Sequence, residues 1–251
     1  MPARRADIDI VGDAFAFLTD GANWTGSAGI PTRLWEHVQM SLIATLLALV
    51  VALPVGLAIG HSRKGEFLAS SIGNVGRALP SFGVLGLVFP FTLRYLPGSI
   101  GFAATLMALF LLAIPPILIN TYVGVQGVDE DTLEAARGMG MDWRQVLVML
   151  EIPLAVPLIV SGVRNAAVAV VATATLGAVV AWGGLGRFII DGFAVRDHGQ
   201  ILVGAFLVAM LAVMTELGLG ALERALSPRG VKPRPFLPGG DRVVGAVGDA
   251  L

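Results

Sequence analysis

Three ionisable residues lie inside long apolar segments of the chain, where a charge is costly unless it has a partner. They are Arg77, Arg164 and Glu216. A glutamate and an arginine on neighbouring helices can form a salt bridge, so we expect Glu216 to pair with Arg77 or Arg164 and to tie two helices together. The alternative for both arginines is that the long side chain extends to the membrane surface and places its charge in water.

The remaining residue types offer no catalytic or metal-binding group. The sequence has no cysteine, and its three histidines stand alone near the ends of apolar segments, where such residues are usually interfacial: His37, His61 and His198. The two lysines, Lys64 and Lys232, are not part of a phosphate-binding G-x-x-x-x-G-K-[ST] loop. We therefore expect a chain that is not an enzyme, has no catalytic residue, metal or cofactor, and does not itself hydrolyse ATP.

The composition indicates a membrane protein. Of 251 residues, 55% are hydrophobic and only 14% are charged, and the mean hydropathy is +0.80. Soluble domains average about a quarter charged residues. The net charge of −1, without a basic stripe, argues against a nucleic-acid partner. The lipid bilayer is therefore the expected surroundings.

Five apolar segments are each close to the ~20 residues that cross ~30 Å of hydrocarbon. They are expected at about 38–60, 68–91, 100–122, 153–182 and 201–222. Pro54 is expected to kink the first segment, and Pro80 and Pro90 to break the second. Gly56 and Gly60 are four residues apart, a spacing typical of two helices in close contact. The sequence therefore predicts a packed bundle of about five transmembrane helices.

Three regions follow from this pattern: an external or interfacial segment at 1–36, a membrane domain at 37–226 and a tail at 227–251. Helical spacing of apolar residues before position 20 fits a short helix on the membrane surface, with a loosely ordered segment as the alternative. A further short helix is expected around 187–194. The tail is rich in proline, glycine and arginine, so we expect it to be disordered and cytoplasmic.

A charged segment from Asp129 to Pro153 separates the third apolar segment from the fourth. Its pattern predicts two short amphipathic helices joined by a tight turn. Asp131 with Glu134, and Asp142 with Gln145, fit capping boxes at the two helix starts. We expect Gly138 and Gly140 to adopt the left-handed conformation that ends the first helix, and Pro153 to stop the second. One face of each helix is apolar: Leu133 and Ala136 beside Arg137 on the first, and Val146, Leu147 and Leu150 on the second. This hairpin is expected to offer an apolar ridge as a docking surface.

The same segment resembles the cytoplasmic loop of ATP-binding-cassette (ABC) importer permeases, whose pattern is E-A-A-x-x-x-G, nine residues, then I-x-L-P. The matching residues are Glu134, Ala135, Ala136 and Gly140, followed after nine residues by Leu150, Glu151, Ile152 and Pro153. Leu150 replaces the isoleucine of the pattern and Ile152 its leucine. The resemblance implies that the loop inserts into a groove on a separate ATPase subunit, which binds the ATP and magnesium. The residues expected to couple the two subunits are Glu134, Ala135, Ala136, Gly138, Gly140, Leu147 and Pro153.

Three further stretches narrow the resemblance to permeases of osmoprotectant importers, which carry glycine betaine, choline or carnitine: 77–87, 114–129 and 171–186. The resemblance covers about 36–222. It implies an all-α, MetI-like permease of a type I ABC importer with a cytoplasmic coupling hairpin. The implied partners are ATPase subunits at that hairpin, a second permease that is a paralogue or another copy, and an extracellular solute-binding protein.

In that family, Ala-Leu-Pro-Ser and Gly-Gly-Leu-Gly belong to the translocation path and its outer gate. Polar residues within the apolar segments are further candidates for the path, although serine and threonine in membrane helices more often bond to their own backbone. The candidate path and gate residues are Ala78, Leu79, Pro80, Ser81, Asn120, Thr173, Thr175, Gly183, Gly184 and Gly186.

Basic residues predict the orientation in the plasma (cytoplasmic) membrane. Arg63 and Lys64 precede the second apolar segment, Arg137 and Arg144 lie in the hairpin, and more arginines follow the last segment. The positive-inside rule then places the N-terminus outside and the C-terminus inside. Arg94, Arg187 and Arg196 would lie outside, so the orientation rests mainly on the hairpin having to face ATP.

Two other functions stay open. The same architecture could import a methionine-type amino acid, ergothioneine or a bile-acid-like solute. An ion-coupled secondary transporter would have internal repeats and a carboxylate at mid-membrane, and the sequence shows no clear repeat.

Overall fold

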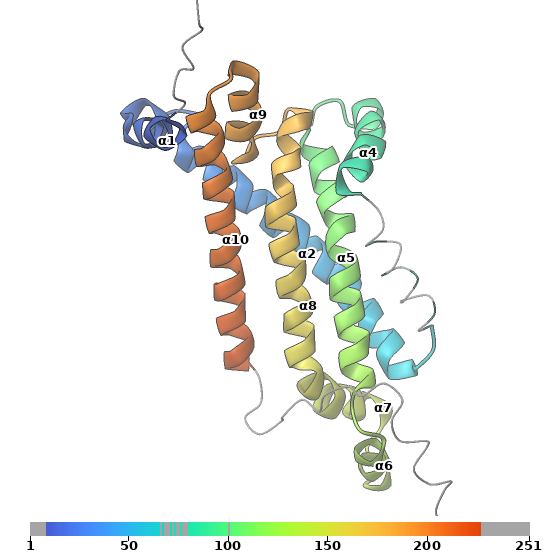
Figure 1. The fold of residues 1–251 in the computed structure, drawn as a ribbon. Helices are drawn as coiled ribbons and strands as arrows, with labels where there is room; N and C mark the ends of the chain where they lie inside the picture. Colours follow the sequence, from blue (N-terminus) through green and yellow to red (C-terminus); the bar gives the residue numbers. More distant parts are fainter. Residues whose placement is uncertain are drawn as a thin grey trace, which may run out of the picture.

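The computed structural model describes residues 9–65, 67, 71, 73, 76, 80–99 and 101–226, and every regular element among them is a helix. Four helical stretches are long and apolar enough to cross a membrane. They contain α2 (Ile30–Ser62), α5 (Phe102–Gln126), α8 (Ile152–Thr173) and α10 (His198–Leu226). Helices α5, α8 and α10 stand side by side, and α2 crosses behind them at a slant (Figure 1). The predicted all-α membrane fold is confirmed.

The second predicted apolar segment, 68–91, is only partly described. Helix α4 (Ser81–Tyr95) begins after Pro80, whose backbone is extended (φ −67°, ψ 123°), so the predicted break at Pro80 is confirmed. The prediction for Pro90 was wrong, because α4 continues through it. Proline removes one hydrogen bond, and neighbouring groups in a bundle can compensate for that loss. With 15 residues, α4 spans ~22 Å, less than the hydrocarbon core.

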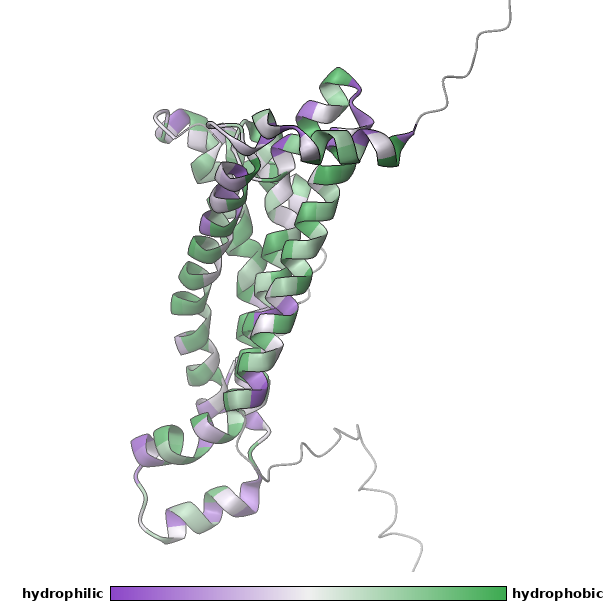
Figure 2. Ribbon diagram, turned by 90° about the vertical axis from the view of Figure 1, so that its left-hand side faces the viewer, coloured by the Kyte–Doolittle hydropathy of each residue, from purple (hydrophilic) through white to green (hydrophobic). Residues whose placement is uncertain are grey.

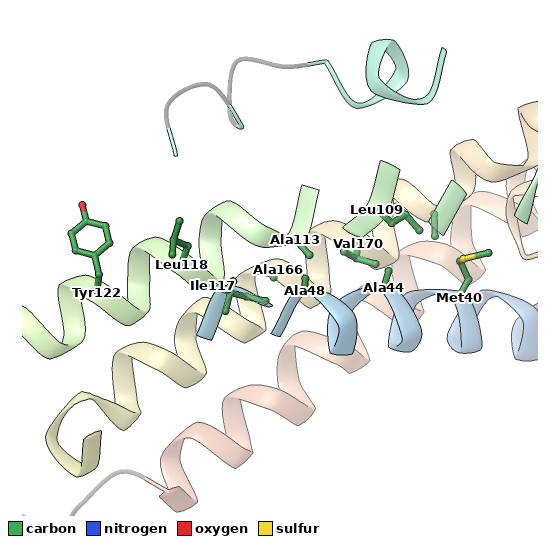
Figure 3. Packing of buried hydrophobic residues seen from close by; sticks show 12 residues of the cluster. Met40, Ala44, Ala48, Leu109, Ala113, Ile117, Leu118, Tyr122, Ala166 and Val170 are labelled. Atoms are coloured by element: carbon green, nitrogen blue, oxygen red, sulfur yellow. The ribbon is translucent and has the colours of Figure 1, made fainter. Parts of the chain in front are cut away.

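Helices α2 and α5 pack closely because glycines face the contact. A Cβ atom at Gly56 would lie 2.7 Å from Cβ of Thr121, and one at Gly60 would lie 2.6 Å from Cβ of Val125. Real carbon atoms do not approach so closely, so any side chain at these positions would push the helices apart. The predicted close contact is confirmed, and the small residues Ala44 and Ala48 extend it along α2 (Figure 3).

Helix α8 completes the core by packing against both α5 and α2. Ala166 and Val170 of α8 are fully buried with Ala113 and Ile117 of α5 (Figure 3). A Cβ atom at Gly162 would lie 2.6 Å from Cβ of Asn120, so this contact also depends on a glycine. Helices α2, α5 and α8 therefore form the core of the bundle, and the short helices lie at its two ends.

The two ends carry short helices, whereas the middle of the bundle is mainly hydrophobic (Figure 2). At one end lie α1 (Ile10–Thr19), a 3₁₀ turn at Gly21–Trp24 and α9 (Gly186–Val195). At the opposite end lie α6 (Glu130–Gly138) and α7 (Trp143–Gln145) (Figure 1). The helices predicted before position 20 and around 187–194 are thus confirmed. The predicted tail at 227–251 lies outside the described residues.

Candidate functional site

The hairpin between α5 and α8 begins with an aspartate cap that lies earlier in the sequence than the predicted one. The carboxylate of Asp129 accepts a hydrogen bond from the backbone N–H of Asp131 at 3.1 Å, so the cap is Asp129 and the prediction of Asp131 was wrong. Val128 before the cap and Leu133 after it are buried in one cluster. This apolar pair brackets the first turn as a hydrophobic staple, and it fixes which of three successive acidic residues becomes the cap.

The turn of the hairpin depends on a single glycine. The N–H of Gly140 donates to the carbonyl of Arg137 at 2.9 Å, and the N–H of Met141 donates to that of Ala136 at 3.2 Å. This pair of bonds is the Schellman motif, which requires a left-handed residue. Gly140 supplies it with φ +84°. Gly138 belongs to α6 and has no positive φ, so its prediction was wrong.

The second half of the hairpin continues directly into the membrane. The predicted capping box is confirmed, with Asp142 and Gln145 bonded in both directions at 2.8 Å. After α7 the chain forms a π-helical turn at Val146–Glu151 and then α8, so the prediction that Pro153 stops the helix was wrong. A π turn leaves one backbone carbonyl without its usual N–H partner. Pro153, which has no N–H to donate, lies just after this turn, so the helix continues through it. A displacement of this half of the hairpin must therefore also move α8.

The predicted apolar ridge faces the interior of the hairpin instead of solvent. Leu133, Ala136 and Val146 are 1–3% exposed and pack against one another. Two amphipathic helices joined by a short turn bury their apolar faces in each other, and Val128 and Leu154 pack against the same cluster. The surface left for a partner is formed by four exposed apolar side chains, here called the hairpin surface: Met139, Trp143, Val148 and Met149.

The expected coupling residues divide accordingly. Those exposed on the hairpin are Glu134, Ala135, Gly138, Gly140 and Pro153. Leu147 is half-buried, whereas Ala136 is buried inside the hairpin. Ala136 therefore supports the hairpin and does not belong to its outer surface.

Sequence reasoning missed two contacts that join the hairpin to the end of α2. The carboxylate of Glu151, 3% exposed, accepts from Nδ1 of His61 at 2.6 Å. Nearby, Arg63 and Glu130 form an exposed ion pair at 3.0 Å. An acidic residue between apolar neighbours at the start of a membrane helix was a signal that Glu151 needs a partner. Its partner could not be read from the sequence, because His61 is 90 residues away.

At the opposite end of the bundle, α2 holds the predicted gate, the loop Gly183–Gly186. Glu36 accepts from the N–H of Gly184 at 2.8 Å, and Nδ1 of His37 accepts from the N–H of Leu185 at 3.3 Å. The expectation of an interfacial histidine was wrong for His37, which is 1% exposed. Gly184 has φ +80°, a conformation that favours glycine, and Gly183 and Gly186 leave no room for a side chain.

Two predicted path residues meet at one place. Ser81 and Thr173 line a cavity of ≈ 10 Å³ between α4, α5 and α8, about the volume that one water needs. Beside it, a larger cavity of ≈ 680 Å³ separates α4 from α5 and is lined almost entirely by apolar groups, with Ser81 at its edge. Pro80 stands at the start of α4, next to both cavities. Ala78 and Leu79 lie outside the described residues.

The other polar candidates bond to their own helices. The side-chain amide of Asn120 donates to the carbonyl of Pro116 at 2.8 Å, and the hydroxyl of Thr175 donates to that of Ala172 at 3.0 Å. This is the alternative that sequence reasoning held open for hydroxyl residues. Asn120 and Thr175 therefore bond within their own helices, and their place in the translocation path stays a prediction.

The predicted intramembrane ion pair forms between α8 and α10. Nη1 of Arg164 lies 3.5 Å from a carboxylate oxygen of Glu216 and 3.3 Å from one of Glu223. Gly220 leaves room for the arginine. The second carboxylate was not foreseen, and Arg77 lies outside the described residues. Within the described part of the chain, no three acidic or histidine side chains gather to hold a metal ion.

Comparison with known proteins identifies the family. Residues 37–229 match the family model of the binding-protein-dependent transport system inner membrane component. The chain is 38% identical over 200 residues to the carnitine transport permease protein OpuCB of Listeria monocytogenes, covering 80% of this chain and 89% of that protein. It is 35% identical over 198 residues to the glycine betaine/carnitine/choline transport system permease protein OpuCB of Bacillus subtilis (strain 168), covering 78% and 88%.

A solved structure shows the same fold. It is the MetNI methionine ABC transporter in an inward-facing conformation. One chain of that structure is 25% identical to this chain and matches it with a TM-score of 0.67, covering 78% of this chain and 95% of that one. The chain belongs to the binding-protein-dependent inner membrane component family and is the permease subunit of an ABC importer.

Proposed function

We propose that this permease forms the passage for quaternary amine osmoprotectants such as glycine betaine, choline or carnitine, and that a separate ATPase drives it through the hairpin. The observation that carries the coupling is the unbroken helical path from the capped turn at Asp142, through the π turn, into α8. A subunit seated on the hairpin surface can displace α8 only if these parts move together. ATP and magnesium belong to that ATPase.

The cargo is supported by the relatives, which are named as carnitine or glycine betaine/carnitine/choline permeases. The ≈ 680 Å³ cavity beside Ser81 is large enough for such a solute, but its mainly apolar lining offers little to pair with the charge of a quaternary amine. The residues described as lining this cavity include no aromatic ring. A cation held tightly needs such rings, so we assign selection to a separate solute-binding protein and weak passage to this chain.

We infer that the hairpin lies in the cytoplasm. Arg63, Arg137 and Arg144 lie at the hairpin end of the bundle, as the positive-inside rule favours for a cytoplasmic face. Because Arg187 and Arg196 lie at the opposite end, the inference rests mainly on the hairpin having to face the ATP of its partner. The N-terminal helix α1 and the loop Gly183–Gly186 are then external. A second permease, either a paralogue or another copy, would complete the passage, and the solute-binding protein would dock at the external end.

Uptake by the complete transporter in proteoliposomes tests the cargo. Labelled glycine betaine, choline and carnitine are supplied with the solute-binding protein, and labelled methionine serves as the control cargo. We expect saturable uptake of at least one quaternary amine, which falls tenfold or more when ATP is omitted. Uptake of methionine alone would contradict the cargo and retain the importer. Uptake driven by an ion gradient without ATP would contradict both.

A further inference from the structure

Helix α2 contacts the functional parts at both ends of the molecule. It runs without interruption over 33 residues, so it is ~50 Å long. Near its start it binds the gate loop Gly183–Gly186, and at its last turn it binds the hairpin. Building on the proposed function, we propose that α2 links the coupling hairpin to the external gate, and that Glu36 and His37 are the residues with which it holds that gate closed.

The hydrogen bonds of His37 define one state of the gate. Because Nδ1 accepts from Leu185, the proton of the neutral ring is on Nε2, which lies 2.8 Å from the carbonyl of Val171 and donates to it. Helix α8 changes to a 3₁₀ turn at Ala174–Val180, and such a change leaves a carbonyl without its usual partner. His37 supplies that partner, so one buried ring joins α2, the end of α8 and the gate loop.

Glu36 adds a second bond on the same loop. Its carboxylate accepts from Gly184 and also pairs with Arg33 at 2.9 Å. A side chain at Gly183 would strike this carboxylate, and one at Gly186 would strike the backbone of Thr175. The loop therefore fits against α2 in one close arrangement. It can leave that arrangement only by losing the bonds from Glu36 and His37 together.

At the other end, movement of the hairpin reaches α2 through the partly buried bond between Glu151 and His61. His61 and His37 are 24 positions apart on the same helix, or ~36 Å. The solved transporter with this fold is inward facing, a state whose external side is closed. We take the bonded gate, in which Glu36 and His37 hold the loop, as the closed one. Movement of the hairpin on ATP binding would displace α2, break these bonds and open the external side.

A single cysteine reports the gate directly, because the chain has none of its own. Leu185 lies in the gate loop and is 0% exposed, so a maleimide can reach this position only when the loop leaves α2. Leu185→Cys is labelled from outside with a membrane-impermeant maleimide, in the complete transporter in proteoliposomes, and the label on this chain is measured with and without ATP and vanadate. We expect slow labelling without ATP and faster labelling with it.

Alanine variants remove the bonds at the gate and at the hairpin, and glutamine variants keep an acceptor for them. Glu36→Ala and His37→Ala are expected to raise labelling without ATP about tenfold, a typical size of coupling between sites. Glu36→Gln keeps an oxygen for Gly184 and should label like the parent. Glu151→Ala should remove the response of labelling to ATP while hydrolysis continues, whereas Glu151→Gln keeps an acceptor for His61 and should respond.

Three results would decide against the inference or separate it from the cargo. Equal labelling of Glu36→Ala and Glu36→Gln in assembled transporters would overturn the role of the bond at the gate. A normal ATP response in Glu151→Ala would overturn the role of α2 as the link. ATP-dependent labelling with no uptake of any quaternary amine would refute the cargo and support the link, because labelling does not depend on the cargo.

Discussion

Replacing Gly140 with valine is expected to lower ATP-driven uptake tenfold or more, with the chain still inserted in the membrane. A side chain at this position meets nothing within 4 Å, so no clash is involved. The cost is conformational, because φ +84° is disfavoured for every residue with a Cβ and most for β-branched ones. The Schellman turn would be lost, and the two halves of the hairpin would separate. Uptake and ATP hydrolysis, measured in the same proteoliposomes, check this.

Gly218 on α10 provides the matched control, because a side chain there also meets nothing within 4 Å, its backbone is helical, and it lies away from the hairpin. Gly218→Val should therefore retain uptake. Gly140→Asn should retain part of it, since asparagine tolerates the left-handed conformation better than other residues. If Gly140→Val and Gly218→Val transported equally well, the turn would not be required for coupling.

Replacing Gly56 with leucine is expected to destabilise the permease by about 3 kcal/mol or more, at the upper end of what overpacking costs. The new side chain would have to occupy the space of Thr121, which is fully buried on α5. Either α2 moves away from α5, or neighbouring side chains leave their preferred rotamers. Thermal unfolding of the purified transporter in detergent, with the yield of assembled complex, measures the effect.

Gly218 on α10 serves as the control for this substitution, because a side chain there meets nothing within 4 Å. Gly218→Leu should leave the unfolding temperature within a degree or two of the parent. An unchanged unfolding temperature in Gly56→Leu would show that α2 and α5 do not depend on this contact.

Features that depend on local sequence were predictable. The long apolar helices, the break at Pro80, the capping box at Asp142 and the glycine contact at Gly56 and Gly60 each follow from a few neighbouring residues. The start of α6 was not, because three acidic residues in a row could each cap the helix. The buried pair of Val128 and Leu133 decided among them.

Features that depend on contacts between distant parts of the chain were missed. Amphipathic spacing shows that Leu133 and Val146 share an apolar role, but it cannot show that they contact each other. Proline usually ends a helix, so Pro153 predicted a stop, but the π turn before it lets the helix continue into α8. The bonds from His61 and His37 join residues 90 and 134 or more positions apart. Such pairs follow from the fold and not from a local pattern.

The central claim is that the hairpin surface receives the ATPase, and cross-linking tests it most directly. Met139 is 77% exposed at the hairpin, whereas Phe193 is 64% exposed at the opposite end of the molecule. Met139→Cys and Phe193→Cys are each placed in the complete transporter and treated with a short bifunctional maleimide. We predict a cross-link from position 139 to the ATPase subunit, with a yield that changes on ATP binding, and none from position 193. No cross-link from position 139 in a transporter that hydrolyses ATP, or a cross-link from position 193, would contradict the account.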